Sequence, residues 1–188
     1  MKLIVLDRNG VINRYADGYI KSPEEWLPIP GALEAVARLN QAGYRVVVTT
    51  NQSGIARGKL SIVALNAIHQ KMHQAAKMAG ADIDAVFFCP HAAEDNCDCR
   101  KPKPGMLRAI ASRYDVSLKG VPVVGDSLCD LQAAFVSGCT PYLVLTGNGE
   151  QTRDKGGLPP GTLTFADLAA AVEHILAQAA ATAPTGTP

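Results

Sequence analysis

Aromatic side chains are scarce in this 188-residue sequence, and neither sign of charge is in excess. Phe, Trp and Tyr together make up 5% of the residues, Trp occurs once, and the formal net charge is +1. Proteins that bind single-stranded nucleic acid combine a basic groove with aromatic side chains on which bases stack. We therefore expect no nucleic-acid partner, and any anionic ligand must be bound by a local cluster of cations.

Long apolar runs are also missing. No segment approaches the ~20 consecutive apolar residues that a membrane-spanning helix requires. The opening stretch, MKLIVLD, reaches an acid at Asp7, too early for the apolar core of a secretory signal peptide. The sequence thus predicts a soluble protein with no membrane partner, located in the cytoplasm.

The apolar residues that are present form short runs separated by helical patterns. Five runs that end in polar residues or glycine are typical of buried strands: 2–7, 44–51, 84–89, 121–126 and 141–147. Helical spacing of apolar residues is found in 31–42, 61–79, 105–114, 128–136 and 166–180. This alternation predicts an α/β fold with a doubly wound, mainly parallel, Rossmann-like sheet. We expect one domain over residues 1–180, acting as a monomer, and a disordered tail over 181–188, which is small, polar and rich in proline.

Polar side chains suited to phosphoryl transfer follow three of these strands and precede one helix. They are, in chain order, Asp7, Thr50, Asn51, Lys101 and Asp126. Each of them alone is more simply interpreted as a turn or capping residue. Together they supply a nucleophile, partners for phosphate oxygens, a cation and a carboxylate that can hold Mg²⁺. Since ligands bind at the carboxyl ends of the strands in such sheets, the combination predicts phosphoryl transfer through an aspartyl-phosphate.

Four stretches that contain these residues resemble the motifs of one enzyme family. LDRNGVIN, TTNQSGIARG, CRKPKPGM and VGDSLCDLQAA are similar to the four motifs of haloacid-dehalogenase-like phosphatases, in the branch that acts on heptose bisphosphate or histidinol phosphate. The resemblance covers about residues 3–147. It implies that Asp7 is the nucleophile and a Mg²⁺ ligand, and that Asp126 completes the magnesium site. It also implies that Thr50 and Asn51 bind the transferring phosphoryl group and that Lys101 pairs with the charge of Asp7.

Asn9 departs from the pattern of that family. By the resemblance, position 9 carries the catalytic general acid/base, which is an aspartate in the family, and its backbone carbonyl is a Mg²⁺ ligand. The amide of Asn9 matches a carboxyl group in shape, so we expect the fold, the magnesium site and substrate binding to persist. An amide transfers no proton, so we expect turnover to be severely impaired. A catalytically silent protein that only binds a phosphorylated metabolite stays open as an alternative.

Three other titratable residues lie on predicted helices. Asp130 lies in the first turn of the helix after Asp126, and it is either a further carboxylate of the site or a solvated acid favoured by the helix dipole. His69 and His73 lie one turn apart on another helix. No carboxylate with ligand spacing accompanies them, so we interpret them as a surface pair.

Cysteine, in contrast to the aromatic residues, is concentrated in one short stretch. Three of the five cysteines, Cys89, Cys97 and Cys99, fall within CPHAAEDNCDC together with His91. In a reducing compartment this clustering favours a metal over a disulfide. Three thiolates and one imidazole complete a tetrahedral Zn²⁺ shell and leave no open position, so the predicted zinc is structural. The resembling branch carries the same arrangement, and free thiols beside a surface histidine are the alternative.

The spacing of the motifs leaves no room for a domain that caps the site. Only residues 10–31 separate the first motif from the first helix, and one helix, one strand and the zinc loop fill the next gap. We therefore expect an open site, roofed by the loops 13–19 and 52–59 and by the zinc loop. The candidate substrate-binding residues are Asp17, Gly18, Asn51, Gln52, Ser53, Arg57 and Arg100.

Cations on these loops indicate the class of substrate. Arg57, Lys59 and Arg100 can bind a second phosphate, although a solvated loop charge is an equal alternative for Arg57 and Lys59. A bisphosphorylated sugar fits them better than a singly phosphorylated amino alcohol. The resemblance implies removal of the C7 phosphate from D-glycero-D-manno-heptose 1,7-bisphosphate, a step in lipopolysaccharide precursor synthesis. Histidinol-phosphate phosphatase, an enzyme of histidine biosynthesis, stays as the alternative.

Overall fold

One parallel sheet forms the centre of the computed structural model, which describes residues 1–15 and 18–181. The strand order is β3-β2-β1-β4-β5-β6, and all neighbouring strands are parallel. The strands are β1 (Lys2–Asp7), β2 (Tyr44–Asn51), β3 (Ala85–Cys89), β4 (Pro122–Gly125), β5 (Thr140–Val144) and β6 (Leu163–Phe165). The order runs outward from β1 in one direction and from β4 in the other, which confirms the predicted doubly wound α/β fold.

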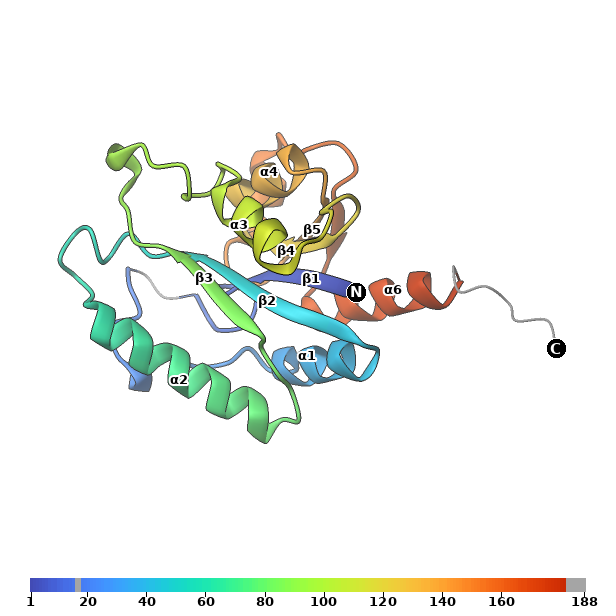
Figure 1. The fold of residues 1–188 in the computed structure, drawn as a ribbon, viewed down its shortest axis with the longest axis horizontal. Helices are drawn as coiled ribbons and strands as arrows, with labels where there is room; N and C mark the ends of the chain where they lie inside the picture. Colours follow the sequence, from blue (N-terminus) through green and yellow to red (C-terminus); the bar gives the residue numbers. More distant parts are fainter. Residues whose placement is uncertain (16–17, 182–188) are drawn as a thin grey trace.

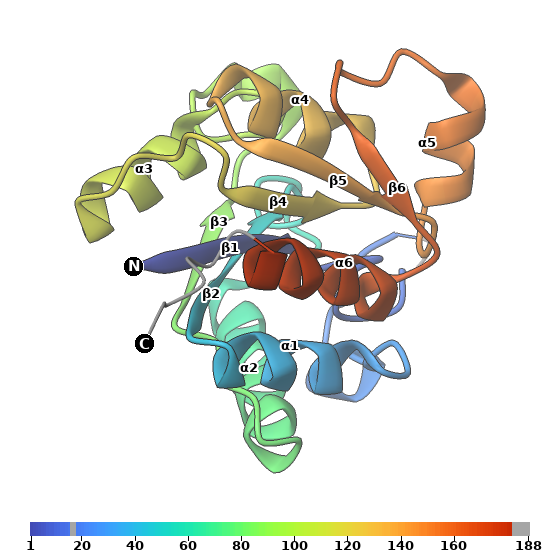
Figure 2. The same cartoon turned by 90° about the vertical axis from the view of Figure 1, so that its right-hand side faces the viewer.

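Helices cover both faces of the sheet. They are α1 (Ala32–Gln41), α2 (Ile62–Met78), α3 (Gly105–Tyr114), α4 (Leu128–Val136), α5 (Gly149–Lys155) and α6 (Leu168–Ala181). Figures 1 and 2 show α3 and α4 on one face of the sheet and α1, α2 and α6 on the other. A strand that is covered on both faces reads as an unbroken apolar run, which explains the pattern of LIVL in β1.

Successive side chains of β1 enter different halves of the core. Ile4 and Leu6 pack among residues of α1, α2 and α6, whereas Leu3 and Val5 pack among residues of α3 and α4. All four are less than 5% exposed. Because β1 pairs with β2 on one side and with β4 on the other, the position of Asp7 at its end is fixed by the whole core.

Two elements were not predicted from the sequence. The strand β6 has only three residues, too few for a periodic pattern, and α5, with the sequence GEQTRDK, has no apolar periodicity. The helix α6 ends at Ala181, one residue inside the predicted tail, and the remaining tail residues, 182–188, lie outside the described residues. Boundaries of the other predicted elements agree with the structure to within three residues.

The connections that hold caps in related folds are short here. Between β1 and α1, the described residues form the 3₁₀ turn η1 (Pro23–Glu25) and two isolated β-bridges, which join Asn13 to Asn9 and to Pro28. Between β2 and α3 the chain forms only α2, β3 and the turn η2 (Ala93–Asp95). The carboxyl ends of the strands are therefore open to the surrounding loops. In the described part of the chain, no helix is both long and apolar enough to cross a bilayer.

Candidate active site

A polar cavity of about 240 Å³ lies at the carboxyl ends of the strands. The strands β1, β2 and β4 end beside it, at the point where the strand order reverses. This is the position at which open α/β sheets bind ligands. Its lining includes predicted site residues from four separate motifs: Asp7, Asn9, Thr50, Asn51, Arg100, Lys101 and Asp126.

Lys101 is the cation at the centre of this cavity. Its Nζ lies 2.6 Å from Oδ1 of Asp7 and 2.6 Å from Oδ1 of Asp130, and it donates to the carbonyl oxygen of Thr49 at 3.2 Å. The side chains of Lys101, Asp7 and Asp130 are all buried. The predicted pairing of Lys101 with Asp7 is thus present in the geometry, and Asp130 is a second partner.

The interpretation of Asp130 as a solvated helix acid is wrong, because Asp130 is only 2% exposed. The helix α4 follows β4 so closely that its first turn faces the end of the sheet. Gly125 makes this approach possible, since a Cβ at that position would lie 2.3 Å from the Cβ of Asp130. Ser127 holds the carboxylate in place through its backbone N–H and its hydroxyl, which both donate to Oδ2.

The carboxylates of this cluster crowd one another. Burial raises the pKa of Asp7 to about 6, with Lys101 opposing this shift and Asp130 adding to it. Burial and the charges of Asp7 and Asp130 raise the pKa of Asp126 to about 8. Oxygens of these three carboxylates lie within 4.8 Å of one another. An all-oxygen set with excess negative charge suits a hard divalent cation such as Mg²⁺.

Asp126 is held by a loop that sequence reasoning missed. The backbone N–H of Asn148 donates to its Oδ2 at 2.8 Å, and the hydroxyl of Thr152 in α5 donates to its backbone carbonyl at 2.8 Å. Gly10 and Gly147 lie against the carboxylate with positive φ, and a Cβ on either would come within 2.0 or 2.2 Å of Oδ2. The signal in the sequence was the stretch TGNG directly after a strand.

Asn51 fixes the backbone of Lys101. Its Nδ2 donates to the carbonyl oxygen of Lys101 at 3.1 Å, and the N–H of Lys101 donates to its Oδ1 at 3.1 Å. Both ends of the amide are therefore engaged across two motifs that lie fifty residues apart. Thr50 is fully buried, and its hydroxyl lies 2.8 Å from the side-chain amide of Gln52.

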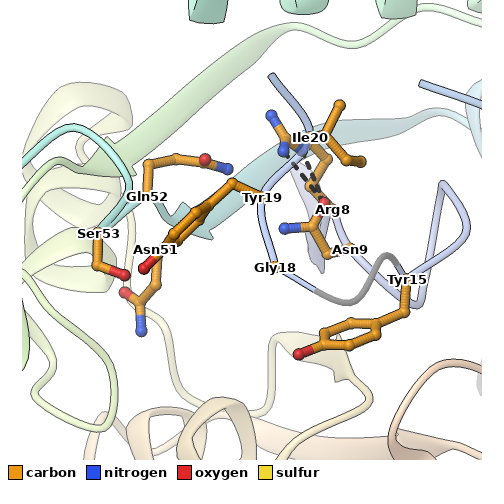
Figure 3. Close-up of a pocket in the computed structure, with 9 residues that line it drawn as sticks. All are labelled: Arg8, Asn9, Tyr15, Gly18, Tyr19, Ile20, Asn51, Gln52 and Ser53. Carbon is orange, nitrogen blue, oxygen red and sulfur yellow. Dashed lines mark hydrogen bonds between the residues drawn. The ribbon is translucent and has the colours of Figure 1, made fainter. Parts of the chain in front are cut away.

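A second cavity, of about 170 Å³, adjoins the first and shares Asn9, Tyr15 and Asn51 with it. Figure 3 shows the side chains around it. The predicted substrate residues Gly18, Gln52 and Ser53 line this second cavity, whereas Asp17 lies outside the described residues.

The predicted loop cations occupy different positions. Arg100 lines the first cavity, and its Nη1 donates to the carbonyl oxygen of His91 at 3.3 Å. Arg57 lines neither cavity; it is exposed, with Nη2 lying 3.3 Å from Oε1 of Glu94. Arg57 therefore links its loop to the cysteine-rich loop. Lys59 is exposed and lines neither cavity, so of the three predicted loop cations Arg100 is the one at the first cavity.

Arg8 and His69 are buried partners that the sequence did not reveal. Nη1 of Arg8 lies 3.2 Å from Nε2 of His69, and Arg8 is 0% exposed. The interpretation of His69 and His73 as a surface pair is wrong for His69, which is 9% exposed. His69 lies on the buried face of α2 with Leu65 and other apolar residues. Burial, helped by the charge of Arg8, lowers its pKa to about 3, so the ring is neutral and can accept from Arg8.

The cysteine-rich loop brings its four predicted ligands together. Sγ of Cys89 lies 3.1 Å from Sγ of Cys99 and 3.6 Å from Sγ of Cys97, and Nδ1 of His91 lies 3.3 Å from Sγ of Cys99. A tetrahedral zinc site with bonds of ~2.3 Å has edges of roughly 3.8 Å. The four ligand atoms all lie within 4.8 Å of one another, and all three cysteines are free thiols. The donor set and its spacing therefore fit Zn²⁺.

The fold and the aspartate–lysine cluster are those of the class that the motifs predict, a phosphatase with a Rossmann-like parallel sheet and its site at the switch point of the strand order. The family model described as haloacid dehalogenase-like hydrolase matches residues 2–138. The chain belongs to this family.

Several relatives match nearly the whole chain. The D-glycero-beta-D-manno-heptose-1,7-bisphosphate 7-phosphatase of Bordetella bronchiseptica is 58% identical over 95% of this chain and 100% of its own length. The protein of the same name from Pseudomonas putida is 51% identical over 94% of this chain and 100% of its own length. The crystal structure of the Bordetella bronchiseptica enzyme, complexed with magnesium and phosphate, has a TM-score of 0.93 and covers 95% of this chain and 99% of its own.

Proposed function

We propose that this protein is a Mg²⁺-dependent phosphatase that removes the C7 phosphate from D-glycero-D-manno-heptose 1,7-bisphosphate in lipopolysaccharide precursor synthesis. The observation that carries the reaction type is the buried pair of Asp7 and Lys101, with Asp126 beside it, in an open polar cavity. The substrate is supported by relatives of that name that are 58% and 51% identical over nearly the whole chain. The enzyme class is therefore phosphoric monoester hydrolase.

The geometry supports the following role for each side chain in the proposed reaction. Lys101 holds Oδ1 of Asp7, which leaves Oδ2 to attack the phosphorus atom. The P–O bond to Asp7 forms as the bond to the sugar oxygen breaks, and that oxygen takes up a proton. Water must supply this proton because the amide of Asn9 cannot, so we expect slow turnover in this chain. Water cleaves the resulting aspartyl-phosphate and returns Asp7 to its free form. Thr50 and Asn51 line the cavity in which the phosphate would lie. Asp7, Asp126 and, by the family resemblance, the backbone carbonyl of Asn9 would hold Mg²⁺, which would neutralise charge on the phosphoryl oxygens.

Mg²⁺ binding is expected to release protons at neutral pH. Without a cation the pKa of Asp126 is about 8 and that of Asp7 is about 6, so Mg²⁺ must displace the proton of Asp126 at pH values between these two. The affinity for Mg²⁺ should therefore rise with pH across this interval and level off above it. Titration calorimetry in two buffers with different ionisation enthalpies measures the released protons. Asp126→Asn should abolish the release, and a heat of binding that is the same in both buffers would contradict the assignment.

We also propose that Cys89, His91, Cys97 and Cys99 hold one structural Zn²⁺. The loop leads directly into Arg100 and Lys101, so a closed metal site fixes the backbone from which both cations reach the cavity. Residues 89–99 close a short loop, which costs little chain entropy on binding.

Loss of this zinc is expected to lower stability and activity together. Elemental analysis should find one zinc per chain, and Cys97→Ser should lower both the zinc content and the melting temperature. Cys139→Ser is the control, because Cys139 is a free thiol outside the cluster, and this change should leave the zinc content at one per chain. Protein that contains no zinc after growth with added metal, or an unchanged melting temperature for Cys97→Ser, would refute the site.

Substrate preference tests the proposed function. We expect the Asn9→Asp protein to hydrolyse heptose 1,7-bisphosphate with a kcat/KM at least ~10-fold above that for histidinol phosphate, because Arg100 can pair with the remote phosphate and binding energy there orients the reacting one. Arg100→Met should remove most of the preference. Equal or reversed values of kcat/KM would favour the histidinol-phosphate phosphatase instead.

We propose further that the protein acts as a monomer in the cytoplasm. The monomeric state is supported by a polar site that is built from residues of one chain. Light scattering of the purified protein tests it, and a stable dimer would overturn it.

A further inference from the structure

Arg8 is a buried cation that the mechanism above does not use. Its Nη1 is 3.2 Å from Nε2 of His69. The amide of Gln52 fits its surroundings with its oxygen toward Arg8, where Oε1 accepts from Nη1 at 3.2 Å and from Nη2 at 2.9 Å. His69 and Gln52 thus hold the guanidinium from the side of α2 and the second motif. Among the described residues no carboxylate lies within ion-pair distance of Arg8, so its direct partners are neutral.

The remaining donors of Arg8 are directed at Asn9. Nε and Nη2 lie 3.2 and 3.1 Å from Oδ1 of Asn9, and Nδ2 of Asn13 donates to the same oxygen at 3.2 Å. Three N–H donors therefore converge on one acceptor. The opposite orientation of the amide would place its own N–H groups against a guanidinium and against Asn13, and all three hydrogen bonds would be lost.

In this arrangement Nδ2 of Asn9 makes no hydrogen bond to any residue in the described ranges 1–15 and 18–181. Asn9 is partly exposed and lines both cavities of the site. Figure 3 shows its amide nitrogen on the side away from Arg8, directed toward the side chains across the cavity. Among the described residues, the two N–H groups of Nδ2 have no hydrogen-bond acceptor. In a cavity that also contains Lys101, such donors are suited to phosphate oxygens.

We propose that Arg8 is a positioning residue that fixes the Asn9 amide with its N–H groups toward the site, where they donate hydrogen bonds to the oxygens of a bound phosphate. The inference deepens the proposed function, since it concerns the same site, but it needs only a phosphate ligand and no turnover. Position 9 then binds the phosphate group without transferring a proton. Arginine suits this role because its rigid planar fork reaches Asn9, His69 and Gln52 at once, which a lysine ammonium does not.

A double-mutant cycle with inorganic phosphate as the probe separates positioning from general support of the fold. Phosphate affinity is measured by titration calorimetry at saturating Mg²⁺. We expect Arg8→Met to weaken phosphate binding by about 10-fold, as for the loss of one charge-assisted hydrogen bond. In the Asn9→Ala background the same change should weaken binding by less than about 2-fold, because the group that Arg8 orients is gone.

Further variants and a spectroscopic signal complete the test. Arg8→Lys, which keeps the buried charge and removes the fork, should have an intermediate affinity, and Arg38→Met, at an exposed arginine on α1, should bind like the parent. The side-chain amide signal of Asn9 in a ¹⁵N–¹H spectrum, assigned by its absence in Asn9→Asp, should shift when phosphate is added to the parent.

Two results would overturn the inference. One is an equal loss of affinity for Arg8→Met in both backgrounds, which indicates a structural role only. The other is an Asn9 amide signal that does not shift when phosphate is added. A parent protein that binds no phosphate would overturn the inference in the same way. Failure to hydrolyse heptose bisphosphate would refute the proposed substrate and leave this inference standing.

Discussion

Asn9→Asp is expected to raise kcat for heptose 1,7-bisphosphate by at least ~10²-fold, because general acid–base catalysis contributes typically about 10²–10⁴-fold. The sugar oxygen leaves poorly without a proton, and the water that cleaves the aspartyl-phosphate needs a base. The side chain at position 9 lines both cavities, so we expect a carboxyl group there to lie beside the reacting phosphate. Its hydrogen bonds to Arg8 and Asn13 use one oxygen, and the second oxygen of a carboxyl group would face the cavity.

The comparison requires fresh protein at saturating Mg²⁺. Asn9 precedes Gly10, a pair prone to deamidation, so mass spectrometry should first establish that the parent still carries the amide. Asn9→Ala serves as the matched control, since it has neither the amide nor the carboxyl group, and it should be no more active than the parent. A parent rate within a few-fold of the Asn9→Asp rate would show that position 9 does not carry the general acid.

Lys101→Met is expected to lower the free energy of unfolding by ~3–5 kcal/mol in Mg²⁺-free buffer and to abolish activity, as for removal of one partner of a buried ion pair. Methionine fills a similar volume, so the effect reports charge and not a cavity. Without the ammonium group, the buried carboxylates of Asp7 and Asp130 lose the cation that lies 2.6 Å from each. The nucleophile also loses the contact that orients it.

Denaturant unfolding measures this effect, with Lys77→Met on the exposed face of α2 as the control. Adding Asp130→Asn to Lys101→Met should recover part of the lost stability, because one of the unpaired charges is then removed. Saturating Mg²⁺ should recover part of it as well. A loss of less than about 1 kcal/mol would contradict the view that this cation balances the cluster.

The sequence alone was enough to predict that the polar residues at the strand ends lie together in one site. Asp7, Thr50 and Asp126 follow apolar runs, and in a parallel sheet such positions meet at one edge, so their convergence followed from the order of strands and helices. The four zinc-loop ligands could be predicted for a different reason: they lie close together in the sequence, which restricts them to a small volume. The outer loop positions were less predictable, as Arg57 pairs with Glu94 instead of lining the cavity.

Buried polar partners could not be predicted, because their burial depends on which helix face meets the sheet. His69 is one turn from His73, and only the packing of α2 separates the buried residue from its neighbour. Arg8 follows the nucleophile as an ordinary charged residue in the sequence, yet it is fully enclosed by partners from two other segments. Asn148 and Thr152 lie on a loop and a polar helix without an apolar pattern, so nothing local indicated that they hold Asp126.

The most direct test of the account is phosphate release from heptose 1,7-bisphosphate by the Asn9→Asp protein, measured with Mg²⁺ and with or without a second change, Asp7→Asn. Asp7 is the carboxylate that Lys101 orients toward the cavity, so the account predicts steady release by Asn9→Asp, a phosphoenzyme trapped by acid quench, and loss of both when Asp7→Asn is added. Release that persists with Asp7→Asn would contradict the assignment of Asp7 as the nucleophile.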